Sequence, residues 1–441
     1  MSFPRFPEYK DSGVPWLGEV PAHWFVGKVK HITSFFTGWT PPTGNAAFYE
    51  GENPWANISD LGPKWLAEPS KRISDEAVGH SGITLSPTGS LLFSFKLSIG
   101  QVSFAARDMY TNEAIATFPP SERLNLAFAY YALPHYVVQN ASENIYGAKL
   151  LNQELIKTAS VAVPSIHEQQ AIATFLDCET AKIDALVAEQ EKLIALLQEK
   201  RQAVISHAVT KGLDPNVPMK DSGVKWLGEV PGHWEVCALK RHWTATDCKH
   251  VTAEFVEDGI PLASIREVQS RWVALEEAKR TTEYFYRLLI EGGRDPRPGD
   301  LIFSRNATVG EVAQVHRDHE LFAMGQDVVL LRRAAEAASP DFLQLVIRSS
   351  VVTQQLALCM VGSTFKRINV EEIRSLVIAF PPPDEQTTIA NHLLSEAAGF
   401  DSLITEARTA ITLLQERRTA LISAAVTGQI DVRGIASRDV S

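Results

Sequence analysis

The sequence contains little cysteine. Only 4 of its 441 residues are cysteine, and they lack the paired spacing of a disulfide scaffold or a structural zinc finger. Cys237, His242, Cys248 and His250 fall close together, but their spacing matches no common zinc site. The sequence therefore predicts neither disulfides nor a metal site.

Long apolar runs are also absent. No stretch of about 18 apolar residues occurs, and the first residues, MSFPRFPEYKDSG, contain no apolar signal segment. We therefore expect a cytoplasmic protein that does not enter a membrane.

Basic residues are in the minority. The chain has 42 Lys and Arg against 52 Asp and Glu, a formal net charge of -10. None of the segments 1–165, 166–211, 212–383 and 384–441 has more basic than acidic residues. Since attraction to the phosphate backbone comes from clustered Lys and Arg, a DNA reader of this composition needs local basic loops or a partner that supplies phosphate contacts.

Two catalytic motifs are missing. The chain has no GxxxxGK loop to hold the phosphates of ATP, and no Asn or Asp followed by Pro-Pro and an aromatic residue, the base-holding motif of adenine methyltransferases. The carboxylates Asp384 and Glu385 stand at a predicted helix start, where acidic residues complement the helix dipole. The sequence predicts a protein without catalysis or a cofactor of its own.

An internal repeat dominates what is present. KDSGVPWLGEVPAHW at Lys10–Trp24 recurs as KDSGVKWLGEVPGHW at Lys220–Trp234, 210 positions later. Near the end, LLQEKRQAVISHAVT at Leu196–Thr210 recurs as LLQERRTALISAAVT at Leu413–Thr427. One unit of about two hundred residues is therefore present twice, and we expect a pseudo-twofold arrangement.

Each copy combines strand-like and helix-like segments. The apolar runs SLLFSF, SVAVP, DLIFS and SLVIAF predict strands, whereas the ends of both copies lack interior Gly and Pro and predict long helices. We expect an α+β chain with these parts: a mainly-β domain at 1–165 that includes segment 10–24, a helix at 166–211, a second such domain at 212–383 that includes segment 220–234, a helix at 384–430 and a tail at 431–441.

The two predicted helices carry an apolar seam. Its residues alternate at spacings of three and four, as in a coiled coil, and a helix of more than forty residues extends roughly 65 Å. An antiparallel coiled coil is favoured over an ordinary core helix, packed through Ile172, Leu176, Ile183, Leu186, Leu193, Leu197, Val204, Ile389, Leu393, Phe400, Leu403, Leu414 and Leu421.

Three repeated motifs identify a family resemblance. SGVxWLGEVPxHW opens each copy, GxLxFS follows with a glycine six residues after its serine, and PxxxEQxxI enters each long helix. Together they resemble the specificity subunits of Type I restriction-modification enzymes over nearly the whole chain.

The resemblance implies a function. Each mainly-β part would be a target-recognition domain that reads one half of a bipartite site in double-stranded DNA, and the helices would space the two domains. Partners would be a methylation subunit, expected in two copies, and a restriction subunit, and S-adenosylmethionine, ATP and Mg would be bound by them. Because SFFTGWTPPTGNAAFYEG in the first copy has no match in HWTATDCKHVTAEFVEDG of the second, we expect two unlike half-sites.

Polar loops next to repeated motifs supply the candidate DNA-binding residues, since base edges are read mostly by Arg, Lys, Asn, Gln, Ser and Thr. They are Lys96, Asn144, Tyr146, Lys149, Arg305, Asn306, Thr308, Lys366 and Arg367. The alternative function is a coiled-coil adaptor that binds proteins and has no DNA specificity.

Overall fold

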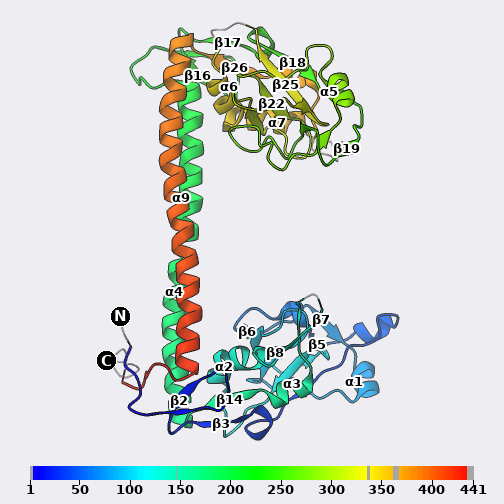
Figure 1. Cartoon of the computed structure of the whole chain (residues 1–441), viewed down its shortest axis with the longest axis vertical. Helices are drawn as coiled ribbons and strands as arrows, with labels where there is room; N and C mark the ends of the chain where they lie inside the picture. Colours follow the sequence, from blue (N-terminus) through cyan, green and yellow to red (C-terminus); the bar gives the residue numbers. More distant parts are fainter. Residues whose placement is uncertain (1–2, 146, 335–337, 361–366, 435–441) are drawn as a thin grey trace. The chain divides into compact units, whose positions relative to one another are not determined.

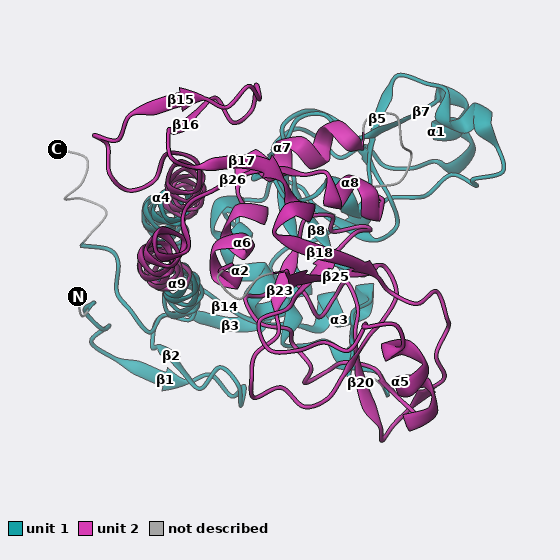
Figure 2. Cartoon of the chain, turned by 90° about the horizontal axis from the view of Figure 1, so that it is seen from above, with its two compact units in different colours: residues 1–190, 409–441 teal, residues 191–408 magenta. Residues whose placement is uncertain are grey.

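The computed structural model describes residues 3–145, 147–334, 338–360 and 367–434. The chain forms two compact units, unit 1 (1–190 and 409–441) and unit 2 (191–408). Their boundary falls inside the two long helices, so each unit contains part of α4 (Ile166–Lys211) and part of α9 (Pro383–Val426) (Figure 2). The second helix ends before the expected residue 430, because Gly428 takes a left-handed conformation with φ 76°.

Unit 1 is built on a five-stranded mixed sheet of order β4-β11-β8-β9-β6, with the helix α2 packed on β8 and β9 (Figure 1). Among the residues of unit 1 that the structure describes, a three-stranded sheet of order β10-β5-β7 and three strand pairs accompany it. Its elements besides the long helices are β1 (Tyr9–Asp11), β2 (Glu19–Pro21), β3 (Phe25–Lys28), η1 (Val29–His31), β4 (Phe36–Thr37), η2 (Ala46–Tyr49), β5 (Asn53–Ala56), η3 (Ile58–Asp60), β6 (Trp65–Leu66), β7 (Lys71–Ile73), α1 (Asp75–Ser81), β8 (Leu91–Ser94), β9 (Val102–Ala105), β10 (Tyr110–Thr111), β11 (Ile115–Phe118), α2 (Leu126–Val138), β12 (Ser142–Glu143), β13 (Lys149–Leu150), α3 (Gln153–Thr158) and β14 (Ser160–Val163).

Unit 2 contains two four-stranded sheets, of order β18-β25-β22-β23 and β19-β21-β20-β24. Its further elements are β15 (Met219–Asp221), β16 (Glu229–Pro231), β17 (Glu235–Ala238), η4 (Leu239–Arg241), β18 (Trp243–Asp247), β19 (Phe255–Val256), β20 (Ile260–Ala263), β21 (Arg280–Thr281), α5 (Glu283–Ile290), β22 (Leu301–Ser304), β23 (Val312–Gln314), β24 (Ala323–Met324), β25 (Val328–Arg333), α6 (Pro340–Ile347), α7 (Ser350–Cys359), α8 (Val370–Arg374) and β26 (Val377–Phe380). No single helix within the described ranges is long and apolar enough to cross a membrane, and only α6 and α7, bent by 58°, pass that test as a pair.

The four apolar runs form the predicted strands β8, β14, β22 and β26. In unit 1, β14 pairs antiparallel with β3, which directly follows the repeated opening segment, and Val163 lies opposite Phe25. In unit 2, β26 pairs with β17 in the same way, and Phe380 lies opposite Glu235. Each long helix therefore begins directly after a strand that is paired with the start of its own globular domain.

A buried glutamine fastens the start of α4 to the globular part of unit 1. Gln169 is only 1% exposed. Its Oε1 accepts a hydrogen bond from the backbone N–H of Asn125 (2.7 Å), the N-cap of α2. Its Nε2 donates to the backbone carbonyls of Arg123 (3.2 Å) and Pro164 (3.0 Å). Rotating the helix about its axis would leave these polar groups buried without partners.

The same arrangement recurs at the start of α9. The Oε1 atom of Gln386 accepts a hydrogen bond from the backbone N–H of Ser339 (3.0 Å), the N-cap of α6. Its Nε2 donates to the carbonyl of Pro381 (2.9 Å). The glutamine of the PxxxEQxxI motif is therefore a structural residue that sets the angle between helix and domain.

The glutamate before each glutamine holds the repeated opening segment. His23 Nε2 lies 2.7 Å from Glu168 Oε1, and His233 Nε2 lies 2.7 Å from Glu385 Oε2. Burial raises the pKa of Glu168, but hydrogen bonds from His23 and Ser165 outweigh this effect and leave the pKa below its usual value. The carboxylate therefore stays ionised and keeps its contact with the opening segment.

The long helices pack in opposite directions within each unit. In unit 1, Arg418 Nε lies 2.9 Å from Asp184 Oδ1, and in unit 2, Arg201 Nη2 lies 3.7 Å from Asp401 Oδ2. In unit 1, Arg433, just beyond the end of α9, lies 3.8 Å from Glu168 at the start of α4. In unit 2, Gly212, just beyond the end of α4, lies beside Glu385 at the start of α9. Within each unit the two helices are therefore antiparallel.

Most predicted seam residues are buried or half-buried, namely Ile172, Leu176, Ile183, Leu197, Val204, Ile389, Leu393, Phe400, Leu414 and Leu421. For Leu186, Leu193 and Leu403 the prediction is wrong, because they are 50%, 42% and 49% exposed. In each case the next residue along the helix is β-branched, apolar and less exposed. Where two adjacent residues are both apolar, spacings of three and four fit either of them, and packing against the neighbouring side chains decides which one faces inward.

The glutamine junction yields a stability prediction. Gln169→Ala should lower the free energy of unfolding by about 1 to 3 kcal/mol, because it leaves buried backbone groups without partners. Gln170→Ala is the matched control, since Gln170 is the next residue of the same helix and is exposed, and it should change stability by under roughly 0.5 kcal/mol. Urea unfolding of the full chain, followed by circular dichroism, measures both. Equal effects would contradict the role of the junction.

Candidate nucleic-acid interface

Both units carry the same hairpin loop at the end of a buried strand. In unit 1 the loop joins β8 to β9, and Ser94 Oγ donates to the carbonyl of Lys96 (3.0 Å). In unit 2 it joins β22 to β23, and Ser304 Oγ donates to the carbonyl of Asn306 (3.1 Å). We call residues 95–99 and 305–309 the tip loops. Their matching hydrogen bonds show that the repeat extends to local backbone geometry.

The tip loops share an unfavourable backbone conformation. Leu97 has φ 57° and Ala307, its counterpart 210 positions later, has φ 56°. Among the described residues, the only other non-glycine residue with positive φ is Asp327, which lies beside the second tip loop. Such conformations cost about 1 to 3 kcal/mol and cluster at functional sites. The sequence search did not find this feature, which concerns the backbone alone.

The candidate cation of the first tip loop is already paired with an acid. Lys96 Nζ lies 3.8 Å from Glu113 Oε1, and both side chains are about half exposed. Burial raises the pKa of Glu113, but hydrogen bonds from Thr40 and Lys96 and the charge of Lys96 outweigh it and leave the pKa low. Because exposed ion pairs contribute little to stability, Lys96 could leave Glu113 for another partner at a small cost in free energy.

Arg305 is buried, unlike the other described candidates. Its side chain is 5% exposed, and its Nη1 lies 3.2 Å from Asp247 Oδ2. Its Nη2 lies 3.4 Å from His250 Nε2. The prediction that this guanidinium contacts DNA is not supported, because the charge lies inside the protein, paired with Asp247.

Two of the remaining described candidates of unit 2, Asn306 and Arg367, meet around one acid. Asn306 Nδ2 donates to Asp327 Oδ2 (3.2 Å), and Arg367 Nη2 lies 3.7 Å from Asp327 Oδ1 with its side chain 51% exposed. Thr308 Oγ1 hydrogen bonds with Ser304 Oγ (3.0 Å). Asn306 and Arg367 also form a backbone bridge, so two segments far apart in sequence lie side by side at this loop.

A second loop of unit 1 connects β12 to β13. The Oδ1 atom of Asn144 accepts from the backbone N–H of Ala148 (2.9 Å), so this side chain shapes the turn. Lys149 is exposed on β13. Tyr146 and Lys366, also candidates, lie outside the described residues.

Sequence reasoning missed two exposed apolar side chains, because it considered polar residues only. Leu97 in the first tip loop and Ile145 in the β12–β13 loop are each 91% exposed. Apolar side chains in such positions contact thymine methyl groups or wedge between bases. A search for apolar residues at the tips of glycine-bounded loops would have found both.

Comparison with known proteins gives the family. The family model described as the Type I restriction modification DNA specificity domain matches residues 21–195 and 294–408. The chain is 21% identical over 319 residues to the EcoBI specificity subunit of Escherichia coli, covering 70% of this chain and 66% of that protein. It is 25% identical over 198 residues to the MjaIX specificity subunit of Methanocaldococcus jannaschii, and the alignment spans 44% of each chain.

Solved structures show the same fold. A chain from a structure of the type I R-M system gives a TM-score of 0.68 at 13% identity and covers 92% of this chain and 98% of its own. The crystal structure of the HsdS subunit from Thermoanaerobacter tengcongensis gives 0.52 at 14% identity, covering 93% and 98%. The expected α+β fold with two long helices is confirmed. With two copies of the matched domain, the chain belongs to the family of Type I restriction-modification DNA specificity subunits.

Proposed function

We propose that this chain reads a bipartite DNA sequence for a Type I restriction-modification complex, with one half-site per globular domain. The observation that carries the proposal is the pair of tip loops, which have the same strained backbone but present different side chains. Unit 1 displays Lys96, Leu97 and Ser98, and unit 2 displays Asn306, Ala307 and Thr308. A fixed frame with variable tips is what two readers of unlike half-sites require.

The charge distribution supports recognition that depends on partners. The exposed candidate cations at the tip loops are paired with acids. Lys96 in the first loop pairs with Glu113, and Arg367, which lies beside the second loop, pairs with Asp327. Because these acids offset the attraction to phosphate, the chain alone should bind DNA weakly and with little non-specific affinity. We propose that two copies of a methylation subunit, one docked on each repeat, supply phosphate contacts and S-adenosylmethionine.

The rest of the assignment follows from this role. A restriction subunit would supply ATP- and Mg-dependent translocation and cleavage, and this chain would catalyse no step. The helices α4 and α9 would fix the gap between the half-sites, since a rigid spacer keeps two readers in register with the turns of DNA. The complex would act on chromosomal DNA in the cytoplasm.

Mapping of methylated adenine tests the proposal. The chain is co-expressed with the methylation subunit encoded beside it in a host without DNA methylation, and N6-methyladenine is mapped by single-molecule sequencing. The expected result is one bipartite motif with two unlike halves and a fixed unspecific gap. A stable complex that methylates nothing, or no complex at all, would contradict the proposal, and the second result would favour the protein-binding adaptor.

The tip loop yields a prediction that separates recognition from stability. Leu97→Gly removes an exposed side chain and relieves the positive φ, so the free energy of unfolding should stay within about 1 kcal/mol of the native value. The rate of methylation at the bipartite target should fall, because the contact with the first half-site is lost and each lost base contact costs about 1 to 3 kcal/mol.

Ile145→Gly, at the other exposed apolar tip of unit 1, shows whether recognition is confined to one loop. Melting temperature and methylation rate are measured on the same complexes. Unchanged methylation by the Leu97 variant would remove this side chain from the interface.

A further inference from the structure

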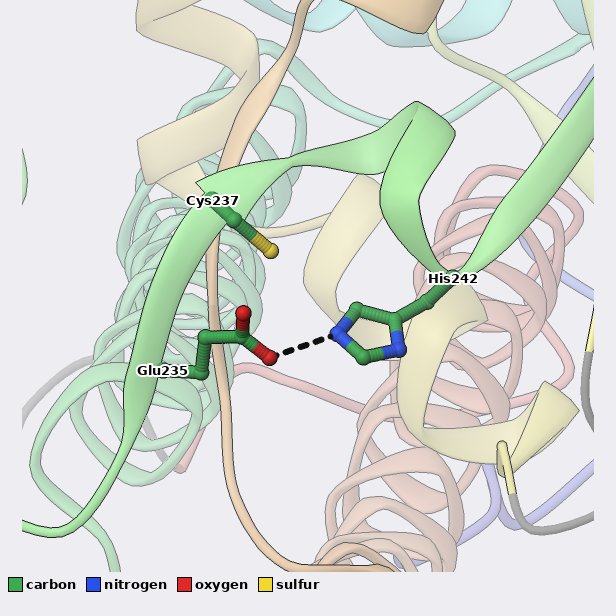
Figure 3. Close-up of side chains that lie close together, drawn as sticks. All are labelled: Glu235, Cys237 and His242. Carbon is green, nitrogen blue, oxygen red and sulfur yellow. Dashed lines mark hydrogen bonds and ion pairs between the residues drawn. The ribbon is translucent and has the colours of Figure 1, made fainter.

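Three side chains of unit 2 with metal-binding atoms converge at one point. Glu235 and Cys237 lie two residues apart on β17 and therefore project from the same face of the strand. The short helix η4 then turns the chain back, and His242 directly after it points toward both (Figure 3). A carboxylate, a thiol and an imidazole thus face one another in a segment of eight residues.

The distances suit a small metal ion. The three ligand atoms lie within 4.8 Å of one another, and His242 Nε2 is 3.0 Å from Glu235 Oε2. Tetrahedral zinc with bonds of about 2.0 to 2.3 Å holds its ligand atoms roughly 3.3 to 3.6 Å apart. Small side-chain rotations would close the cluster around such an ion, and all three residues are half-buried.

Neighbouring groups hold the ligands in position. The ring of His242 packs on Phe380 with centroids 4.5 Å apart. Arg241 Nε pairs with Glu235 Oε1 at 2.5 Å and leaves the other oxygen directed at His242. Outer contacts of this kind orient metal ligands, although the charge of Arg241 also weakens attraction for a cation.

The first unit has the same backbone without these ligands. Its equivalents are Phe25, Gly27 and Ile32, and the turn is closed by the same hydrogen bond, from Ile32 N–H to the carbonyl of Val29. The Phe25 ring covers Gly27 so closely that an added Cβ would lie 2.5 Å from it. Since the fold forms with apolar residues here, the Glu-Cys-His cluster of unit 2 is not required by the shared architecture.

We propose that Glu235, Cys237 and His242 bind one Zn²⁺ ion through oxygen, sulfur and nitrogen, with water at the fourth position. Mixed ligands of this kind suit zinc among the common divalent ions. The ion would tie β17 to the start of β18, the strand that carries Asp247, the partner of Arg305 beneath the tip loop. Sequence spacing did not predict the site, because it grouped Cys237 and His242 with Cys248 and His250 and omitted Glu235.

A second group, Asp247, Cys248 and His250, is less suitable. The Oδ2 atom of Asp247 is already bound by Arg305, and His250 contacts the same guanidinium. A metal ion there would have to displace a buried cation, at a large energetic cost.

Zinc binding should depend on pH. Zinc binds cysteine as the thiolate, so the metal must displace the thiol proton. Affinity should rise with pH, and binding should release protons.

Metal titration of the full chain tests the site. The protein is stripped with a chelator and titrated with Zn²⁺ by calorimetry in two buffers of different ionisation enthalpy, and with Co²⁺ by absorption spectroscopy. We expect one ion per chain, proton release, and the charge-transfer band of a cobalt–thiolate bond. Cobalt binding without that band would overturn the assignment.

Variants locate the site. Cys237→Ser and His242→Asn should each weaken binding by at least the roughly 10- to 100-fold that loss of outer-shell partners causes. Cys359→Ser, at an exposed cysteine of the same unit, should bind as the native chain does. Circular dichroism of the chelator-treated proteins verifies folding. Equal binding by all variants would mean an adventitious ion and would reject the proposal.

Discussion

The attachment of each globular domain to a long helix depends on one buried side-chain amide. Gln169 and Gln386 each use both ends of the amide. The oxygen bonds the N-cap of a domain helix, and the nitrogen bonds the proline directly after the strand that precedes the long helix. A buried amide satisfied at both ends permits one angle between helix and domain. The proposed function would require this rigidity, because a tip loop displaced by a fraction of a base pair would no longer meet base edges.

Much of this architecture could be predicted from the sequence. The repeat, the strands that begin and end each domain and the two long helices follow from periodicity and apolar runs, which are local properties. The sequence did not predict which residue faces inward where two neighbours, such as Leu186 and Val187, are both apolar. Packing against the neighbouring side chains selects Val187. Residue type predicts burial when the choice is between polar and apolar, and fails when both neighbours are apolar.

The candidate site was less accessible to sequence reasoning. Arg305 was selected as a polar loop residue, yet Asp247, 58 positions earlier in the chain, draws its guanidinium into the interior. The acids Glu113 and Asp327 also approach the tip loops from distant segments. The positive φ of Leu97 and Ala307 has no local sequence signal at all, since neither residue favours it. The sequence motifs therefore could not predict two features of the candidate site, its long-range charge pairs and its strained backbone.

We propose that each domain reads its own half-site independently of the other, and exchanging one domain for a copy of the other tests this. The two domains open and close with equivalent strand pairs, so Glu235–Phe380 can be replaced by a copy of Phe25–Val163 with matched ends. The methylated motif of the exchanged chain, formed with the native methylation subunit, is then determined. We expect that the first half-site is retained and appears twice, separated by a fixed gap. Retention of the original second half-site, or a motif with two new halves, would contradict it.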